Sequence, residues 1–364
     1  MPIDFKTLDG QPRVLIEAAL KPVAGTRIQP TGFPDLGPAT YDAPDGNGGT
    51  IATLLVESAQ SMANRLEAVC WDDAADDLSP ELRGLPYVRV KLAGLGNGTD
   101  TTTSLLEFHR LNSPYIMNGV TQDGKTFADT LKPELGMTAV PAASKKKKPK
   151  AKGEDTAMAE AGNGQKEPDD VAGVVNLRKL AKVCFEYDPN SLVHGVFLEK
   201  IAGRLRHPRA LSAFIEASGV GRADSGGVKF DRALPKPSVA GVDAKGGYGN
   251  VPFHRSEFTA KSITAYFSLD LAQICGYGLG VDASRLLIAL SLWKVRKFLD
   301  SNMRLRTACE LELADGDGSI HVKRPKNFDL PPAAESATTI GELIKKCKSQ
   351  LAEPTVTELI WNKP

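Results

Sequence analysis

The alternation of apolar and polar residues predicts a strand near the start of the chain and a helix after it. Residues 13–19 (RVLIEAA) have the composition of a first strand. Residues 22–49 are rich in glycine and proline and show no periodicity, which predicts a long excursion without regular structure. Apolar residues then recur at helical spacing and predict a helix over residues 59–70, in which Ser58 is either the N-cap or an interior residue.

The rest of the chain alternates between strand-like and helical patterns. Residues 87–92 (YVRVKL) alternate as in a half-buried strand whose outward residues, Arg89 and Lys91, are basic. Asp282 suits the N-cap of an amphipathic helix that continues to Phe298. Two further helices are predicted at residues 177–186 and 340–351, and strands at residues 193–198, 210–216, 256–269 and 304–313. This order predicts an α+β fold in which helices cover one face of an antiparallel sheet.

One segment, residues 140–170, divides the chain by its composition. It contains seven lysines and six acidic residues among Ala, Gly and Pro, which predicts a mobile insertion. Its KKKKPKAK run is either a phosphate contact or a solvated flexible stretch. We therefore expect one elaborated domain made of residues 1–139 and 171–364, with the lysine-rich insertion between them and a Gly-rich loop at 241–250.

The overall composition excludes several classes of protein. Hydrophobic residues make up 41% of the 364 residues, enough for a sizeable core, and no long apolar run or signal-peptide layout is present, so we expect a cytoplasmic protein without a membrane partner. Lys and Arg number 45 against 44 Asp and Glu, so a basic surface for nucleic acid has to be local. The five cysteines form no CxxC pair, which predicts buried, reduced thiols and neither a metal site nor a cofactor: Cys70, Cys184, Cys275, Cys309 and Cys347.

A polar cluster marks the start of the helix predicted at 59–70. Hydroxyl, amide and guanidinium groups lie within a turn and a half: Ser58, Gln60, Ser61, Asn64 and Arg65. Unpaired backbone N–H groups and the helix dipole make such a start a seat for phosphate, which these side chains extend. The plainer alternative is ordinary capping followed by a solvated helix face.

Five ordered motifs carry a family resemblance. They are SAQSMANRLE at 58–67, EFHRLNSPYI at 107–116, NSLVHGVFL at 190–198, RALSAFIEA at 209–217 and GGYGNVPFHR at 246–255. Together they resemble the RAMP-superfamily backbone protein of type I-G (formerly I-U) CRISPR interference complexes. The resemblance covers most of the chain but not the lysine-rich insertion or the extreme C-terminus.

The resemblance implies both a fold and a function. The fold is a ferredoxin-like, RRM-type core with an antiparallel sheet, helices on one face and long inserted loops that form a thumb and fingers. Copies of the protein would stack along one guide RNA and present it for pairing with target DNA. The other partners would be the large subunit and the subunits that cap and process the guide. Either the excursion at 22–49 or the loop near Tyr248 would supply the thumb.

The resemblance also implies which residues contact RNA. In related backbone proteins a helix start of this kind binds guide phosphates, which matches Ser58, Gln60, Ser61 and Arg65 here, whereas Asn64 stands where relatives often carry lysine. Further candidates are Lys21, Arg27, Gln29, His109, Arg110, Arg206, Arg209, Tyr248, His254 and Arg255. The histidines and arginines among them are equally compatible with buried or plain surface roles, and we expect His194 to lie in the core.

Two alternatives to a scaffold remain at this level. A target-RNA endonuclease would use an aspartate in the loop after the first strand, where Asp35, Asp42 and Asp45 lie. A stand-alone RNA-binding or guide-processing protein would need paired histidines or an aromatic-rich RNP strand, and the sequence shows no local example of either. We therefore expect that the protein is not an enzyme.

Overall fold

The central sheet is built from strands in which every second residue is apolar. In β1 (Arg13–Pro22) the alternate residues from Val14 to Leu20 are buried, and the residues between them are partly exposed. β16 (Ser262–Asp270) pairs with β1, and β13 (Leu211–Ser218) pairs with the other edge of β16, both antiparallel. Both strands repeat the alternation, so the three present one apolar face to the core.

The computed structural model describes residues 3–33, 36–93, 95, 100–137, 176–199, 201, 205–230, 232 and 249–362. The chain divides into two units, each made of three segments. The first contains Met1–Arg83, Ala210–Ile274 and Ser284–Leu343, and the second contains Gly84–Arg209, Cys275–Ala283 and Ile344–Pro364. The lysine-rich insertion lies outside the described residues.

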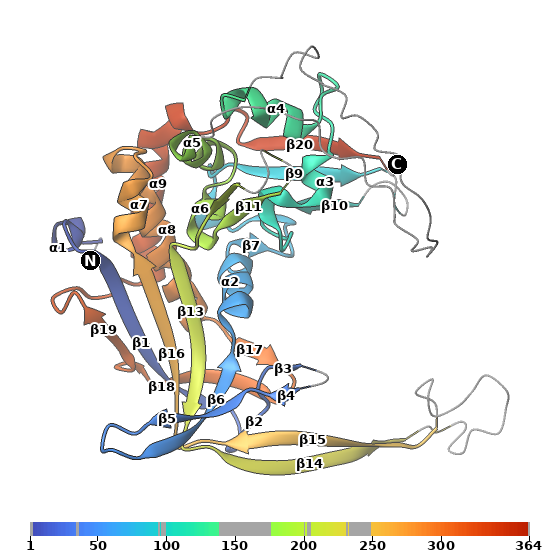
Figure 1. The fold of residues 1–364 in the computed structure, drawn as a ribbon, viewed down its shortest axis with the longest axis vertical. Helices are drawn as coiled ribbons and strands as arrows, with labels where there is room; N and C mark the ends of the chain where they lie inside the picture. Colours follow the sequence, from blue (N-terminus) through green and yellow to red (C-terminus); the bar gives the residue numbers. More distant parts are fainter. Residues whose placement is uncertain are drawn as a thin grey trace, which may run out of the picture. The chain divides into compact units, whose positions relative to one another are not determined.

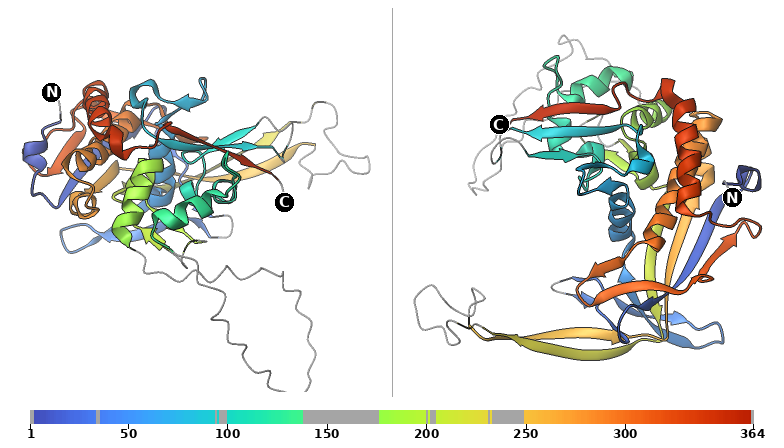
Figure 2. Two further views of the ribbon diagram at one scale, coloured as in Figure 1. Left: turned by 90° about the horizontal axis from the view of Figure 1, so that it is seen from above. Right: turned by 180° about the vertical axis from the view of Figure 1, so that it is seen from behind.

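The first unit holds the large sheet. Its strand order is β17 (Met303–Arg306), β18 (Cys309–Asp317), β1, β16, β13, β6 (Thr50–Glu57) and β5 (Thr40–Pro44), with β19 (Ile320–Arg324) also paired to β1. Helices α8 (Val281–Asp300) and α9 (Ala333–Cys347) lie on one face of this sheet (Figures 1 and 2). Phe298 of α8 meets Phe267 of β16 with ring centroids 6.3 Å apart, so helix and sheet share the core.

Smaller elements complete the first unit. Helix α2 (Ala59–Ala68) follows β6, and short elements flank the sheet: α1 (Phe5–Leu8), β2 (Arg27–Ile28), β3 (Gly32–Phe33), β4 (Gly37–Pro38), β7 (Trp71–Asp72), β8 (Asp77–Leu78), a 3-10 turn at Pro80–Leu82 and α7 (Leu271–Gly276).

A long two-stranded ribbon projects from the sheet. β14 (Gly221–Lys229) pairs with β15 (Val251–Thr259) along its whole length, and β2 joins the outer edge of β15. The two strands run side by side away from the large sheet (Figure 2). The Gly-rich loop expected at 241–250 lies in the connection between them and, except for Gly249 and Asn250, falls outside the described residues.

The second unit has its own small sheet. β9 (Tyr87–Leu92) lies between antiparallel β10 (Thr101–Thr103) and parallel β20 (Val356–Trp361). Around it are α3 (Pro114–Met117), α4 (Phe127–Glu134), α5 (Leu177–Tyr187), α6 (Pro189–His194) and the hairpin of β11 (Val196–Leu198) and β12 (Leu205–His207), with 3-10 turns at Arg110–Asn112 and Lys348–Gln350. None of the helices within the described ranges is long and apolar enough to cross a membrane.

Most predicted elements are confirmed. The strands predicted at 13–19, 87–92 and 210–216 correspond to β1, β9 and β13, and the helices predicted at 59–70 and 177–186 correspond to α2 and α5. The helix expected from Asp282 is α8, although Asp282 is in its first turn and not at its N-cap. The mixed α+β fold with an antiparallel sheet and helices is therefore observed.

Other predicted boundaries are wrong for identifiable reasons. The excursion at 22–49 contains short strands that lack an apolar alternation: β2 pairs with the distant β15, β5 pairs with β6, and β3 pairs with β4. The strand predicted at 256–269 is two strands, β15 and β16, and the strand predicted at 304–313 is the hairpin of β17 and β18, which turns at Ala308 with a φ of 58°. The start of 193–198 is helical, and the last helix begins earlier, at Ala333. The turn between β15 and β16 and the turn at Ala308 both interrupt runs in which the strand pattern continues, so periodicity alone does not reveal them.

The cysteines are mostly as expected. Each of the five is a free thiol in the structure, and four are buried. Cys275 is exposed, which corrects the prediction that all five are buried.

Candidate functional site

The polar cluster at the start of α2 divides into an inward and an outward group. Ser58 is the N-cap, and its hydroxyl accepts a bond from the Ser61 backbone N–H at 3.3 Å. The Ser61 hydroxyl donates to the carboxylate of Glu57, and Arg65 Nε donates to the same carboxylate oxygen at 3.2 Å. Ser61 and Arg65 are therefore anchored to the protein through Glu57, although Arg65 stays partly exposed.

Glu57, the last residue of β6, is the centre of this inward group. Its side chain is fully buried, and its second oxygen pairs with Arg306 of β17. Arg306 Nη1 also donates to the backbone carbonyls of Gln29, at 3.0 Å, and Val56, at 3.1 Å. One carboxylate thus holds two guanidiniums, and the cluster keeps a net charge of +1.

The two arginines reach the surface only in part. The side chain of Arg65 is 27% exposed and that of Arg306 is 22% exposed. Arg65 Nη2 donates to the carbonyl of Leu305, and burial lowers the pKa of both guanidiniums below its ordinary value. Arg65 belongs to the last turn of α2, and its side chain reaches back to Glu57, so both guanidiniums lie at the end of β6, where their remaining positive charge favours a bound anion.

The outward group lies on the solvent side of α2. Gln60 is exposed, and its amide donates to the Asn64 side chain at 3.5 Å, one turn further along the helix. These two amides are thus placed to donate and accept at the surface, as phosphate and ribose contacts require.

Two candidates, Lys21 near the end of β1 and Arg27 after it, are paired with acidic residues. Lys21 lies 3.4 Å from Glu312, and Arg27 lies 3.1 Å from Glu257, whose side chain is only 7% exposed. The backbone of Gln29 bonds to Ala308 and accepts from Arg306, so it belongs to the frame of the site at α2. Pairing of this kind reduces the positive charge that Lys21 and Arg27 offer to a ligand.

A pocket of about 630 Å³ brings three candidates together. Gln29, His254 and Arg255 line it, together with the chain at 30–32 and 37–38. Arg255 lies over the ring of Phe253 at 5.6 Å, and His254 Nε2 is 3.5 Å from Asp224. The residues come from β15 and from the excursion after β1, which are far apart in sequence.

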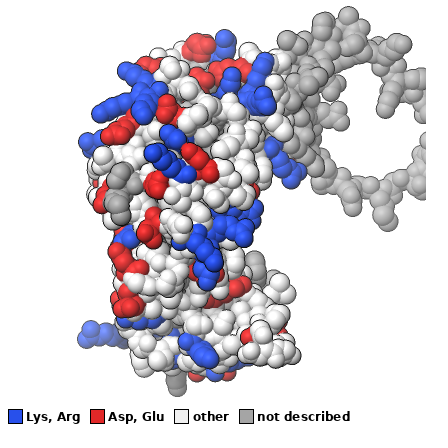
Figure 3. Space-filling view, turned by 90° about the vertical axis from the view of Figure 1, so that its left-hand side faces the viewer, with Lys and Arg blue, Asp and Glu red and all other residues white. Residues whose placement is uncertain are grey.

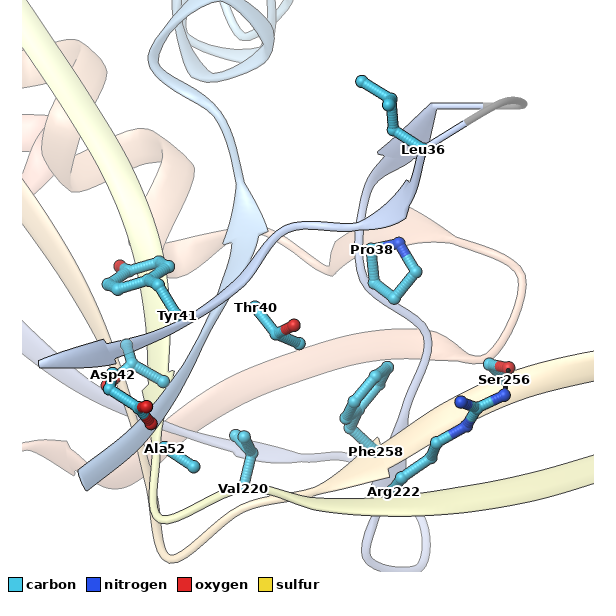
Figure 4. Close-up of a pocket in the computed structure, with 11 residues that line it drawn as sticks. Leu36, Pro38, Thr40, Tyr41, Asp42, Ala52, Val220, Arg222, Ser256 and Phe258 are labelled. Carbon is cyan, nitrogen blue, oxygen red and sulfur yellow. Dashed lines mark hydrogen bonds between the residues drawn. The ribbon is translucent and has the colours of Figure 1, made fainter. Parts of the chain in front are cut away.

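A second pocket, of about 610 Å³, lies at the base of the ribbon (Figure 4). Phe258 and Tyr41 supply aromatic surface, and the Arg222 guanidinium lies beside Ser256, which it contacts at 3.0 Å. Arg222 also donates to Asp224 at 2.8 Å and holds the pKa of that carboxyl below its usual range.

The candidates in the second unit are in different environments. Arg110 is buried, has a φ of 52°, and donates to the Gly195 carbonyl at 3.2 Å. His109 immediately precedes the 3-10 turn that Arg110 begins. Arg206 is exposed and lies over the Phe197 ring at 5.7 Å, and the Arg209 backbone passes close to Gly195. Burial favours a structural role for Arg110. RNA contact stays a prediction for His109, Arg110, Arg206 and Arg209.

Several expectations concern other residues. Tyr248 and Asp35 lie outside the described residues. The Asp45 carboxylate accepts from the backbone of Asn47 and Gly49 in a turn, which lowers its pKa, so its charge is used locally. His194 is buried, as expected. Across the described part of the chain, no group of three or more His, Cys, Asp or Glu side chains could hold a metal ion.

The comparisons with known proteins give a family. The family described as CRISPR-associated protein GSU0053 (Cas_GSU0053) matches residues 14–222. The chain belongs to this CRISPR-associated family. This confirms the type I-G (formerly I-U) CRISPR resemblance seen in the motifs. The match includes β1, Glu57 and α2, and ends at the start of β14.

Two solved structures are similar to the chain at low identity. One, described as "CRISPR RNA-guided surveillance complex, pre-nicking", is 11% identical, with a TM-score of 0.36 over 93% of this chain and 89% of that chain. The other, Csc2 from Thermofilum pendens, is 10% identical, with a TM-score of 0.30 over 95% and 80%. The comparison with curated proteins gave no match.

Sequence reasoning missed two parts of the site of this CRISPR-associated protein. Glu57 is a single acid at a strand end, and Arg306 lies in a predicted strand far along the chain, so no local pattern joins them. The ribbon also carries exposed aromatic residues, Phe230 at 83% and Phe253 at 41%. The sequence does contain a signal for these two phenylalanines. VKFDR at 228–232 and VPFHR at 251–255 both place a phenylalanine two residues after a valine and two residues before an arginine, a pattern that an analysis of helix and strand periodicity does not detect.

Proposed function

We propose that this protein is a backbone subunit of a type I CRISPR effector complex, which polymerises along guide RNA and presents it for pairing with target DNA. The observation that carries the proposal is the cluster before α2 in a chain of this family, where Glu57, directly before the N-cap, holds both Arg65 and Arg306. Guide phosphates fit such a site because it combines backbone N–H groups with fixed positive charge.

The topology of the first unit supports a ferredoxin-like, RRM-type core. The elements β1, α2, β13, β16, α8 and β18 follow in the chain in the order βαββαβ. The four strands lie side by side as β18, β1, β16 and β13. The remaining strands extend this core at its edges, as inserted loops and fingers would.

The ribbon of β14 and β15 supports the proposed thumb. Phe230 and Phe253 are exposed near its far end, and Arg255 lies over the Phe253 ring. Exposed aromatic rings beside cations stack on nucleic-acid bases without reading their sequence. We therefore assign the thumb to this ribbon and not to the excursion at 22–49, and propose that it wedges between guide bases and meets the next copy.

The charge distribution supports contact with the RNA backbone and not with base edges. Lysines and arginines lie among aspartates and glutamates over most of the face drawn in Figure 3. Such a surface lets copies stack without mutual repulsion while a few local cations contact phosphate. Guide sequences vary and must stay available for pairing, so 2′-OH and phosphate contacts supply the affinity.

The proposal assigns the protein no catalytic role or cofactor and places it in the cytoplasm with the other subunits of the complex. The alternative of a target-RNA endonuclease depends on one of Asp35, Asp42 and Asp45, of which Asp42 lines the pocket at the base of the ribbon. If Asp42 were catalytic, Asp42→Asn would abolish RNA cleavage and leave assembly intact. Under the proposed function, neither the wild-type protein nor Asp42→Asn cleaves target RNA.

The deciding experiment is co-expression of the tagged protein with a matching CRISPR array, followed by pull-down, RNA sequencing and nuclease footprinting. Array-derived guide with a regular, periodic footprint is the expected result, because identical subunits contact the RNA at equal spacing. Recovery of no RNA, or of random cellular RNA, in the presence of the other subunits would overturn the proposal.

A further inference from the structure

A buried carboxylate lies directly before the candidate RNA site. Glu57 precedes the N-cap Ser58, and its side chain is 0% exposed. Burying an ionised carboxylate costs several kcal/mol unless charged partners compensate it. Here two arginines and one hydroxyl do so, which shows that the position of this charge is built into the fold.

The contacts of Glu57 join three separate parts of the first unit. Through Ser61 and Arg65 it holds the first two turns of α2, and through Arg306 it holds β17. The same arginines bond the backbone of Leu305, Gln29 and Val56. The carboxylate is therefore the common point of a network that sets the helix start, β17 and the chain after β1 relative to one another.

The network also fixes which donors each arginine turns outward. A guanidinium has five N–H donors in a rigid fork. In both Arg65 and Arg306, some of these donors are held by Glu57 and by backbone carbonyls, so the remaining donors of each guanidinium have a defined direction. Both side chains stay partly exposed. An arginine without this anchor would sample several rotamers and lose side-chain entropy on binding a phosphate.

We propose that Glu57 is a positioning residue for guide-RNA phosphates, acting through Arg65, Arg306 and Ser61 without touching the RNA. This inference rests on the proposed function, because it assigns a role within the same RNA site. Although Glu57 is an anion, its removal weakens RNA binding, because two disordered cations bind a phosphate less well than two oriented ones. If Glu57 served only to offset charge, its removal would strengthen RNA binding.

The test uses the full chain with array-derived guide RNA. Glu57→Gln keeps the shape of the side chain and removes its charge. We expect RNA affinity to fall about tenfold, as for the misplacement of a charge-assisted hydrogen bond. The salt dependence should flatten by about 0.7 in slope for each phosphate that the variant no longer neutralises. Affinity is measured by fluorescence anisotropy over a series of KCl concentrations, on protein shown to be folded by circular dichroism.

The matched control is Glu81→Gln in the same unit. Glu81 pairs with Lys297 at 2.8 Å, so this variant also removes a carboxylate with a cationic partner, but at a place outside the RNA site. It should leave affinity and salt slope unchanged. Ser61→Ala, which removes one donor to Glu57 without changing charge, should weaken binding two- to threefold and provides the test if Glu57→Gln does not fold.

The outcomes separate this inference from the proposed function. If the wild-type protein does not bind guide RNA, both fail. If it binds and the folded Glu57→Gln protein has the same affinity and salt slope, or binds more tightly, Glu57 has no positioning role while the proposed function stands. If Glu57→Gln cannot be folded, wild-type affinity in Ser61→Ala would overturn the inference.

Discussion

At the scale of single residues, the same side chain has different roles in different surroundings. Arg65 is predicted from its place at a helix start, and the structure adds that it is anchored to Glu57. The N-cap role of Ser58 could be predicted because capping is local. The partnership of Glu57 with Arg306 could not, because it depends on how β17 returns to the end of β6 in three dimensions.

The first prediction concerns Arg65. Arg65→Ala should weaken guide-RNA binding and flatten its salt dependence, because one phosphate is no longer neutralised by the protein. It should also lower the free energy of unfolding by about 2 kcal/mol, because Glu57 keeps only one of its two buried cationic partners. Urea unfolding and RNA titration measure the two effects. Arg65→Lys keeps the charge but not the forked guanidinium, so its RNA affinity should lie between those of the wild-type protein and Arg65→Ala. Unchanged affinity and salt slope in the alanine variant would remove Arg65 from the site.

The second prediction concerns Arg110. Its guanidinium is buried and bonded to Gly195, so Arg110→Ala should lower the free energy of unfolding by about 1–3 kcal/mol through loss of a buried hydrogen bond. Exposed Arg206 serves as the control, and Arg206→Ala should change stability little. Urea unfolding of both variants decides it. A stable Arg110→Ala protein with weak RNA binding would instead support a direct RNA contact.

The third prediction concerns pH. A hydrogen bond from Lys297, with a second from Ser79, lowers the pKa of Glu81 from 4.5 to about 2. A lowered pKa in the folded state means that the pair stabilises the fold above about pH 4.5 and that this contribution is lost as the pH falls toward 2. Glu81→Gln should therefore make urea unfolding less dependent on pH in this range. An equal pH dependence of the free energy of unfolding in the wild-type protein and in Glu81→Gln would contradict this prediction.

At the scale of elements, the sequence predicts strands and helices well where one face is buried. β1, β13 and α5 follow from alternation or helical spacing because the core selects the apolar side. The ribbon is different: residues along β14 are largely exposed, so no buried face imposes a pattern on it. Its first arm was not predicted, and its second was merged with β16.

The fourth prediction concerns the ribbon. Phe253→Ala should weaken guide-RNA binding about tenfold, the expected loss of one aromatic stack on a base, and should change stability little because the residue is 41% exposed and lies outside the core. Leu177→Ala, another exposed apolar residue, is the control and should bind normally. Loss of the periodic nuclease footprint would accompany the weaker binding. A Phe253→Ala protein with normal affinity and footprint would exclude this ring from the RNA contact.

At the scale of the whole molecule, composition gave limited guidance. The near-neutral charge gave no indication of the protein's class, whereas the motifs indicated a CRISPR-associated family, which the family match confirms. The division of the chain into two compact units could not be predicted from the sequence either, because both the N-terminal and the C-terminal parts of the chain contribute to each unit. Contacts between distant segments define the units, and no local signal in the sequence marks where the chain crosses from one to the other.

The fifth prediction follows from this interleaving. A fragment of residues 1–209 lacks β13, β16 and β18, so β1 has no strand beside it. We expect the fragment to show no cooperative urea transition, because the apolar face of β1 cannot be buried. Circular dichroism during the titration is the measurement, with the full chain as reference. A cooperative transition comparable with that of the full chain would show that the first 209 residues fold alone.

The central position of β1 also has a consequence for protein synthesis. Its partners β16, β18 and β19 all come after residue 261. At about 5–20 residues per second, the ribosome adds these strands roughly 12–60 s after β1 has been made. During that interval the nascent chain carries an apolar strand with both edges unpaired, which is a target for chaperones and a risk for aggregation. The core around β1 can therefore close only once the chain has been made as far as Arg324, and not when its first half emerges.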